Sequence, residues 1–354
     1  MYSAPIAAAP IEHGGDLAAA RLLFPGAPEP FIDLSTGINP YPYPIPRLTP
    51  DLFTQLPEAA ALDRLSAIAA QAYGAPSAAH VVAAPGTQIL LPLVAALARP
   101  GRAAVLGPTY AEHIRAAAQV GHRVEEVADL ARLRNVALAV VVNPNNPDGR
   151  IVPREALLAC ANDLPAGGLL VVDEAFMDVG ASGLSLAPDI GRGNIVVLRS
   201  FGKFFGLAGL RLGFALAAPP VASRLRARLG PWAVAGPAVA IGAAAMADHS
   251  WAAMTRARLA QAASRLDALL SGANLKVAGG TSLFRLVHSQ AAPELFQHLG
   301  RAGILARRFA REPTWLRFGL PAGERGWQRL AAALAADGWA STGVAAPVRL
   351  PSSS

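Results

Sequence analysis

Short apolar runs recur along this chain between stretches of helical pattern, and this alternation limits the fold more than any other feature. The runs are VVAA at 81–84, AAVL at 103–106, ALAVVVN at 137–143, LLVVD at 169–173, NIVVLRS at 194–200 and GFALA at 213–217. Continuous apolar runs are typical of strands that are buried on both faces. The pattern therefore predicts an α/β protein with a mostly parallel sheet between two layers of helices.

The length of 354 residues is more than twice that of a usual domain, which predicts one large domain and a smaller one. We expect the large domain at 51–247, with a helix at about 58–73. A smaller α/β domain is expected at 248–340, with a helix at about 250–271 and strands near 283–287 and 315–319. The stretch 229–247 is long enough to span a bilayer, but glycine and proline interrupt it. We interpret it as a buried loop and helix.

The two ends of the chain are expected to lie outside these domains. Residues 1–50 include the proline-rich stretch INPYPYPIP at 38–46. Because each proline favours extended backbone at the residue before it, we predict an extended arm. The arm is expected to contribute to the small domain and to wrap a neighbouring subunit in a homodimer. The tail 341–354 is expected to be flexible.

Composition narrows the class of partner. Hydrophobic residues make up 53% of the chain and charged residues 16%, as in a compact globular protein. The net charge is +7, yet the basic residues never form a run of five or six, so we expect no nucleic-acid partner. Cys160 is the only cysteine, which excludes an intrachain disulfide and a zinc site built on thiolates. No secretory pattern opens the sequence, and we expect a cytoplasmic protein without metal or membrane span.

Lysine is rare in this chain, since Lys203 and Lys276 are the only two and all other basic residues of the Lys/Arg type are arginine. Only lysine offers an amine that can form an imine. Lys203 lies in RSFGKFFGLAGLRLGF, directly after an apolar run, and its phenylalanine neighbours predict burial. A buried amine has a lowered pKa and is nucleophilic towards an aldehyde, so Lys203 is the candidate catalytic residue. The alternative is a surface lysine without a chemical role.

Polar residues follow several of the predicted strands where these end. Asp173 ends the run LLVVD, the turn NPNNPDG with Asn146 follows another strand, and Ser200 ends a third. Ligands of such sheets bind beyond the carboxyl ends of the strands. Arg211 and Ser200 are spaced so that both can reach one phosphate, and APGTQ at 84–88 opens a helix whose backbone amides suit an anion. The alternatives are a cap or solvated acid for Asp173 and an ordinary turn around Asn146.

Taken together and in this order, these stretches resemble the fold-type I aminotransferase family (class I/II) over nearly the whole chain. The resemblance implies the three-layer αβα fold of pyridoxal 5'-phosphate (PLP)-dependent transferases. It implies that Lys203 holds the cofactor as a Schiff base, that Asp173 pairs with the pyridine nitrogen, and that Asn146 bonds the phenolic oxygen. The cofactor phosphate would be held by Gly86, Thr87, Gln88, Ser200 and Arg211, with Tyr110 stacked on the ring. The alternative for Tyr110 is an ordinary core side chain.

Three positions depart from the pattern of the family. Phe176 stands in DEAF where many relatives have a tyrosine that bonds the ring oxygen. Gly202 precedes the lysine where relatives often have a hydroxyl residue, and Leu56 stands where relatives often offer a tyrosine to the partner subunit's phosphate site. These departures leave the core chemistry in place but argue against a standard transaminase.

Four further stretches resemble the threonine-phosphate decarboxylases of cobalamin biosynthesis: HGGD at 13–16, LSTGINPYPYP at 34–44, GTSLFRL at 280–286 and WLRFGLP at 315–321. The resemblance implies a small phosphorylated amino acid as substrate, L-threonine O-3-phosphate, which loses carbon dioxide to give (R)-1-aminopropan-2-ol O-phosphate. It implies that Arg317 and Arg307 engage substrate anions, with His13 and Asn39 assisting at the phosphate. For His13 the alternative is a loop residue without a role.

Two other functions stay open from the sequence. The first is transamination of histidinol phosphate or of an aromatic amino acid. An aminotransferase clamps the substrate carboxylate, whereas a decarboxylase clamps the side-chain phosphate, and the sequence does not show which anion each arginine binds. The second is a catalytically silent regulator, which needs a DNA-binding module, and no helix-turn-helix pattern precedes residue 50.

Overall fold

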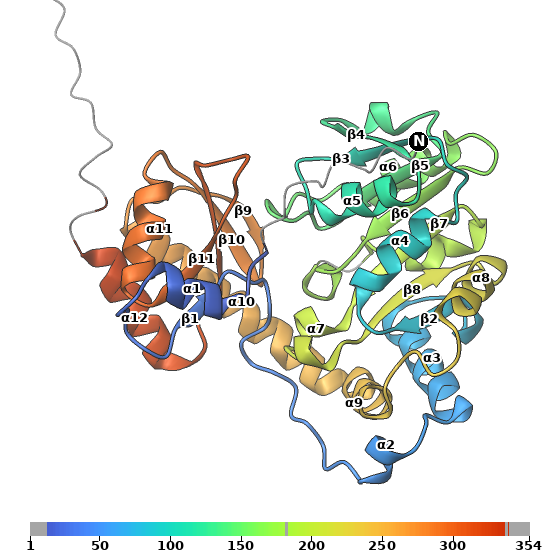
Figure 1. The fold of residues 1–354 in the computed structure, drawn as a ribbon, viewed down its shortest axis with the longest axis horizontal. Coiled ribbons are helices and arrows are strands. Elements are labelled where there is room, and N and C mark those ends of the chain that lie inside the picture. The colour runs from blue at the N-terminus through green and yellow to red at the C-terminus, as the bar shows by residue number, and fades with distance from the viewer. Residues whose placement is uncertain (1–12, 181–182, 337–338, 340–354) are drawn as a thin grey trace, which may run out of the picture.

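A computed structural model describes residues 13–180, 183–336 and 339. The larger of its two sheets has seven strands in the order β2-β8-β7-β6-β5-β3-β4 (Figure 1). Its strands are β2 (Val81–Ala84), β3 (Arg102–Leu106), β4 (Arg123–Val127), β5 (Leu138–Val142), β6 (Leu169–Asp173), β7 (Ile195–Ser200) and β8 (Gly213–Ala217). Neighbours from β4 to β7 pair in parallel, and β8 runs antiparallel to both β2 and β7. The predicted mostly parallel sheet is confirmed.

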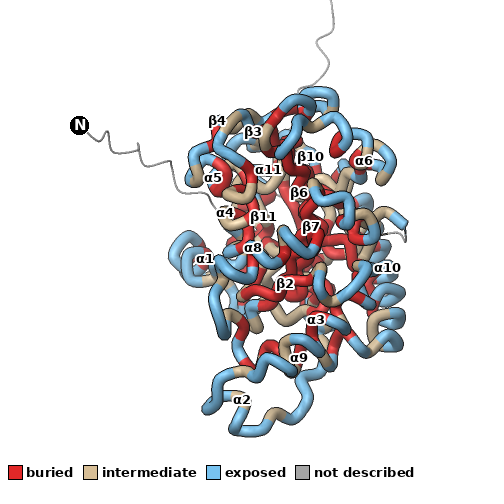
Figure 2. The backbone as a smooth tube through the Cα atoms, turned by 90° about the vertical axis from the view of Figure 1, so that its right-hand side faces the viewer, coloured by how far each residue is buried: buried red, intermediate tan, exposed pale blue. Residues whose placement is uncertain are grey.

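Helices cover both faces of this sheet because its strands are apolar on both sides. Along β5, Leu138 and Val140 pack in one buried cluster and Ala139 and Val141 in another. The first cluster includes residues of α4 (Leu90–Ala95), α5 (Glu112–Gln119) and α8 (Pro219–Leu229). The second includes residues of α3 (Ala59–Tyr73), α6 (Arg154–Asn162) and α9 (Gly236–Ala247). The three-layer αβα arrangement predicted from the sequence is therefore present, with the strands in the buried centre (Figure 2).

The smaller sheet has five strands in the order β1-β11-β12-β10-β9. These are β1 (Ile32–Leu34), β9 (Val277–Thr281), β10 (Phe284–His288), β11 (Ile304–Arg308) and β12 (Trp315–Gly319). Three helices accompany them along the chain, namely α10 (His249–Gly272), α11 (Ala292–Arg301) and α12 (Gly323–Ala335). The side chain of Asp248 caps α10 by accepting a hydrogen bond from the Trp251 amide. The predicted domain change near 248 coincides with this helix start, and the domain boundaries stay a prediction.

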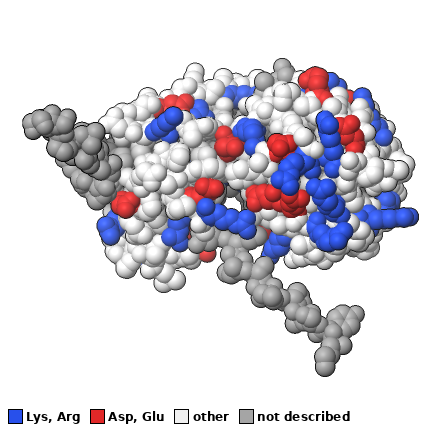
Figure 3. All heavy atoms as spheres, turned by 90° about the horizontal axis from the view of Figure 1, so that it is seen from above, with Lys and Arg blue, Asp and Glu red and all other residues white. Residues whose placement is uncertain are grey.

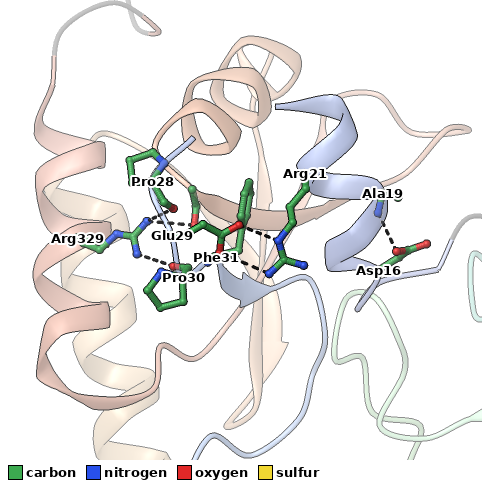
Figure 4. Close-up of polar contacts among 9 residues, drawn as sticks. Asp16, Ala19, Arg21, Pro28, Glu29, Pro30, Phe31 and Arg329 are labelled. Carbon is green, nitrogen blue, oxygen red and sulfur yellow. Dashed lines mark hydrogen bonds and ion pairs between the residues drawn. The ribbon is translucent and has the colours of Figure 1, made fainter. Parts of the chain in front are cut away.

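The N-terminal segment differs from the expected extended arm. It forms α1 (Leu17–Leu23), capped by Asp16, and then β1, which pairs in parallel with β11 of the smaller sheet. Arg329 of α12 donates to the carbonyls of Pro28 and Pro30, while Arg21 is ion-paired with Glu29 (Figure 4). The stretch from about residue 35 to 50 lacks regular structure and leads to the short α2 (Asp51–Thr54). The prediction of an extended arm relied on the prolines and overlooked a helix pattern, namely the N-cap residue Asp16 followed by LAAARLL.

The strands that the sequence did not predict lie mostly at sheet edges or in the smaller sheet. β4 is an edge strand whose RVEEV pattern is charged, and β9 contains two adjacent glycines. Neither reads as an apolar run, because neither is buried on both faces. In the stretch 229–247, α8 ends at Leu229 and α9 begins at Gly236. Among the described helices, none is long and apolar enough to cross a membrane.

Candidate active site

A cavity of about 370 Å³ lies where the carboxyl ends of the large-sheet strands face the smaller sheet. It is lined by residues from the N-terminal segment, from the large sheet and its loops, and from β11 and β12. Among the lining residues are nearly all the sites predicted from the sequence: His13, Gly86, Thr87, Gln88, Tyr110, Asn146, Asp173, Ser200, Lys203, Arg211, Arg307 and Arg317. The remaining predicted residue, Asn39, does not line the cavity.

Lys203 enters the cavity from α7 (Phe201–Phe204), which follows β7 directly. Phe201 and Phe204 on either side of it are fully buried and fix the short helix in the core. Burial and, to a lesser extent, the positive charge of Arg317 together lower the pKa of Lys203 to about 8, against the opposing effect of Asp173. The amine is therefore much closer to its neutral, nucleophilic form at neutral pH than an ordinary lysine.

Asp173 ends β6 and reaches the same cavity while remaining 5% exposed. Its Oδ2 lies 2.8 Å from Nε2 of His113, and its Oδ1 accepts a hydrogen bond from the Ala175 amide. His113 is itself buried, on the first turn of α5. The sequence analysis missed His113, although it stands three residues after Tyr110. A ring nitrogen fixed against one carboxylate oxygen orients the carboxylate for a ligand.

Gly86 and Arg211 form one wall of the cavity by close approach. Gly86 has φ +82°, and a Cβ on it would lie 2.5 Å from Nη2 of Arg211. Arg211 itself sits in the left-handed region at φ 54° and donates to the carbonyl of Ala208. Thr87 and Gln88 follow Gly86 in a short 3-10 turn that leads to α4, and Ser200 lines the same cavity. A guanidinium, a hydroxyl and a turn of backbone amides are donors that suit a phosphate.

Arg317 comes from β12 of the smaller sheet and is 6% exposed. Its Nη1 donates to the side-chain oxygen of Asn146, its Nη2 donates to the carbonyl of Ser35 at 2.8 Å, and its buried Nε has no partner. Among the described residues, no carboxylate lies within ion-pair distance of it. Burial and the charge of Arg307, its cross-strand neighbour, lower the pKa of Arg317 to about 9. The charge of Asp33 opposes this lowering, and an anion in the cavity would balance the positive charge of Arg317 further.

The buried carboxylate of Glu112 connects three residues that line the cavity, Tyr110, His13 and Gln88. The Tyr110 hydroxyl donates to Oε1 of Gln88 at 3.0 Å, and Nε2 of Gln88 donates to Glu112 at 2.8 Å. Nε2 of His13 lies 3.1 Å from Glu112. Burial raises the pKa of Tyr110 to about 12, so its hydroxyl keeps its proton. Glu112 was not singled out in the sequence, because nothing in GPTYAEH distinguishes a buried acid from a solvated one.

Asn39 is 2% exposed, and its side-chain amide forms hydrogen bonds with backbone groups. Its Nδ2 donates to the carbonyl of Phe204 and its Oδ1 accepts from the amide of Tyr41, while its own backbone N–H donates to the carbonyl of Lys203. The structure therefore places Asn39 where it braces the lysine segment, outside the cavity lining. A hydrogen bond from Asn39 to a phosphate in the cavity would require these contacts to be given up.

The three departures from the family pattern have different surroundings. Phe176 lines the cavity and packs edge-on against Phe284, with ring centroids 5.0 Å apart. A Cβ on Gly202 would lie 2.7 Å from the Cα of Ala208, so the close approach of these two segments accounts for the glycine. Leu56 is exposed and is not among the residues that line the cavity.

Basic and acidic side chains are interspersed on the face shown in Figure 3. Ion pairs such as Arg102 with Glu125 and Arg134 with Asp163 are half-exposed. Within the part of the chain that the structure describes, no group of three or more His, Cys, Asp or Glu side chains is arranged to hold a metal ion.

Comparison with known proteins gives the family. The model of the family "Aminotransferase class I and II" matches residues 50–333. A threonine-phosphate decarboxylase from Sinorhizobium sp is 44% identical over 92% of this chain and 98% of that relative, and one from Pseudomonas aeruginosa is 42% identical over 92% and 97%. The histidinol-phosphate aminotransferase of Sinorhizobium meliloti, solved in complex with pyridoxal 5'-phosphate, has the same fold (TM-score 0.72, 23% identity, 85% of this chain and 89% of that one). The chain belongs to the aminotransferase class I and II family.

Proposed function

We propose that this chain is a PLP-dependent carboxy-lyase that converts L-threonine O-3-phosphate to (R)-1-aminopropan-2-ol O-phosphate and carbon dioxide, a step of cobalamin biosynthesis. The observation that carries the proposal is the arrangement of Lys203 and Arg317 around one cavity. An amine with a lowered pKa stands beside a buried guanidinium that forms no ion pair among the described residues and whose Nε has no hydrogen-bond partner. The two threonine-phosphate decarboxylases that are 44% and 42% identical support the choice of reaction.

The donor set of the cavity fits PLP. Lys203 supplies an amine for the aldehyde, and the buried carboxylate of Asp173 suits a protonated pyridine nitrogen. Arg211 lies so close to the backbone of Gly86 that any side chain at position 86 would collide with its guanidinium. Arg211 and Ser200 both line the cavity, and we assign the cofactor phosphate to them. We assign the remaining cofactor contacts to Thr87, Gln88, Tyr110 and Asn146. When bound, PLP supplies a conjugated ring that accepts the electron pair of the bond broken at the substrate α-carbon.

The chain's own residues decide which bond that is. Arg317 and Arg307, which are neighbours across β12 and β11, together with His13 bind the anions of the substrate. Holding the phosphate rather than clamping the carboxylate in an aminotransferase pose leaves the carboxylate free to depart. His113 keeps Asp173 oriented. The pKa of Lys203 is about 8, so its ammonium form is populated near neutral pH and would return a proton to the α-carbon.

The test is incubation of the purified holoenzyme with threonine phosphate in the absence of a keto acid, following carbon dioxide release. We expect steady release from threonine phosphate and poor reaction of unphosphorylated threonine, because a neutral analogue leaves buried cationic groups unpaired. If the enzyme instead requires a keto acid and releases no carbon dioxide, it is an aminotransferase for histidinol phosphate or an aromatic amino acid.

We further propose a homodimer with composite active sites. The segment from 45 to 56 carries three large apolar side chains that are at least 60% exposed, Ile45, Phe53 and Leu56. Such side chains are typical of a surface that another subunit covers. A concentration series that yields a fully active monomer would contradict the dimer.

The single cysteine, Cys160, is buried and free, which supports the predicted cytoplasmic location.

A further inference from the structure

Glu112 is a buried acid at the start of α5 that does not line the cavity, yet it contacts residues that do. Its side chain is 2% exposed. One carboxylate oxygen, Oε1, lies 3.1 Å from Nε2 of His13. The other, Oε2, accepts hydrogen bonds from Nε2 of Gln88 at 2.8 Å and from Nε of Arg115 at 2.9 Å. A carboxylate so deeply buried is costly unless its oxygens are paired, and here both of them are.

The contact with Gln88 fixes the direction of a short chain of hydrogen bonds. An ionised carboxylate only accepts, so the amide nitrogen of Gln88 faces Glu112 and its amide oxygen faces Tyr110. The Tyr110 hydroxyl must then donate to Gln88, at 3.0 Å. The Tyr110 oxygen therefore has only lone pairs left for another partner. A neutral amide in place of Glu112 would allow Gln88 to turn over and would remove this order.

The contact with His13 joins two parts of the molecule. The backbone next to His13 is attached to the smaller sheet, because the Gly15 amide donates to the Ser35 hydroxyl and a Cβ on Gly14 would lie 2.4 Å from the Ser35 carbonyl oxygen. That same carbonyl accepts the hydrogen bond from Arg317. Glu112 holds the imidazole from the large-domain side. Because Glu112 accepts, Nε2 of His13 donates to it and Nδ1 is the ring nitrogen left for a ligand. In the imidazolium form Nδ1 also carries a proton, and it can then donate to a phosphate oxygen.

We propose that Glu112 is a positioning residue that sets the mouth of the cavity for a phosphorylated substrate, acting through His13 and Gln88. The inference rests on the proposed function, since it assigns His13 to the substrate phosphate. His13 is 50% exposed and enters from the N-terminal segment, so without the carboxylate its ring has many orientations available. Glu112 reduces this freedom before the substrate arrives, and the gain appears in substrate binding.

The experiment is a double-mutant cycle with Glu112→Gln, His13→Ala and the double variant, as holoenzymes with threonine phosphate. We expect Glu112→Gln to raise KM about tenfold, as for one lost charge-assisted hydrogen bond, with kcat nearly unchanged. In the His13→Ala background the same change should raise KM much less, because part of what Glu112 positions is gone. Glu125→Gln is the matched control: Glu125 is ion-paired with Arg102 and Arg132 outside the cavity, and KM should not change.

Three outcomes would overturn the inference. Effects of Glu112→Gln and His13→Ala that multiply fully would show that the two act independently, and an unchanged KM would show that Glu112 is structural only. Either result leaves the proposed function intact. A wild-type enzyme that releases no carbon dioxide from threonine phosphate overturns the function and the inference together. If Glu112→Gln fails to fold or to retain the cofactor, Glu112→Asp takes its place in the cycle with the same expected and contradicting results.

Discussion

At the large-domain end of the cavity the polar residues follow adjacent strands of one sheet, whereas the small-domain end combines two paired strands with a segment from the far end of the chain. Asp173 and Ser200 end the neighbouring strands β6 and β7, and Lys203 follows β7 directly. By contrast, His13, Arg307 and Arg317 come from the N-terminal segment and from β11 and β12. The order of the strands brings the residues of the first end together, while the second end also requires the N-terminal segment to pack beside β11 and β12.

The two ends also differ in how their charges are balanced. Behind the large-domain end, buried Arg199 forms ion pairs with Glu174 at 3.0 Å and with Asp178 at 2.7 Å. At the other end, Arg317 forms no ion pair with a described carboxylate and donates instead to the neutral oxygens of Asn146 and Ser35. A braced end suits chemistry that is common to a family, and an end with unbalanced charge suits the recognition of a particular anion.

Replacement of Lys203 by alanine should have the largest effect, because it removes the only amine in the cavity lining. We expect kcat to fall on the order of 10⁴-fold or more. The visible absorbance of the PLP-bound protein should be lost, and peptide mapping after borohydride reduction of the wild type should find the cofactor on Lys203. Lys276→Ala is the control and should keep both colour and activity. Cofactor trapped on Lys276 would contradict the assignment.

Asp173→Asn should affect the reaction for every substrate alike. A neutral amide cannot stabilise a protonated pyridine nitrogen, so kcat/KM should fall roughly 10²–10⁴-fold. Asp189→Asn is a suitable control, since Asp189 is ion-paired with Arg154 in the same domain and does not line the cavity. Equal activity of Asp173→Asn and wild type would remove Asp173 from the mechanism.

Arg317→Ala should instead discriminate between substrates. If Arg317 meets a buried substrate anion directly, its loss should cost about 2–5 kcal/mol in transition-state stabilisation for threonine phosphate. The cofactor absorbance should persist, because the large-domain end is intact. Arg265→Ala, which removes a half-exposed ion pair with Glu324, provides the comparison and should leave kcat/KM unchanged. A variant that loses thermal stability but keeps wild-type kcat/KM would make Arg317 a structural residue.

The smallest effect concerns the pH dependence of cofactor loading. Because the pKa of Lys203 is lowered to about 8, the neutral amine predominates above that pH and the ammonium below it. The rate at which apoprotein gains visible absorbance with PLP should therefore rise with pH up to about 8 and then level off. Arg317→Ala removes a nearby positive charge and should move this midpoint to higher pH. A rate that is flat between pH 6 and 10 would contradict the lowered pKa.

The same division explains what the sequence could and could not predict. Lys203 and Asp173 were predictable because they follow apolar strands, whose carboxyl ends must lie along one edge of a parallel sheet. His113 and Glu112 were not predictable, because their roles depend on contacts from helix α5 to Asp173 and Gln88, which no local sequence pattern indicates. Asn39 was expected in the cavity, yet its amide bonds the backbone at Phe204 and Tyr41 instead. The strand β1 escaped notice because three residues paired with a distant strand leave little periodicity.

We propose that the small-domain end selects loss of the carboxylate over loss of the α-hydrogen. The most direct test is the reaction of the holoenzyme with threonine phosphate in heavy water without a keto acid, followed by NMR. We predict release of carbon dioxide, a product with deuterium at the carbon that carried the carboxylate, and unreacted substrate that keeps its α-hydrogen. Exchange of the α-hydrogen for deuterium without carbon dioxide release would contradict the claim and assign the chain to transamination.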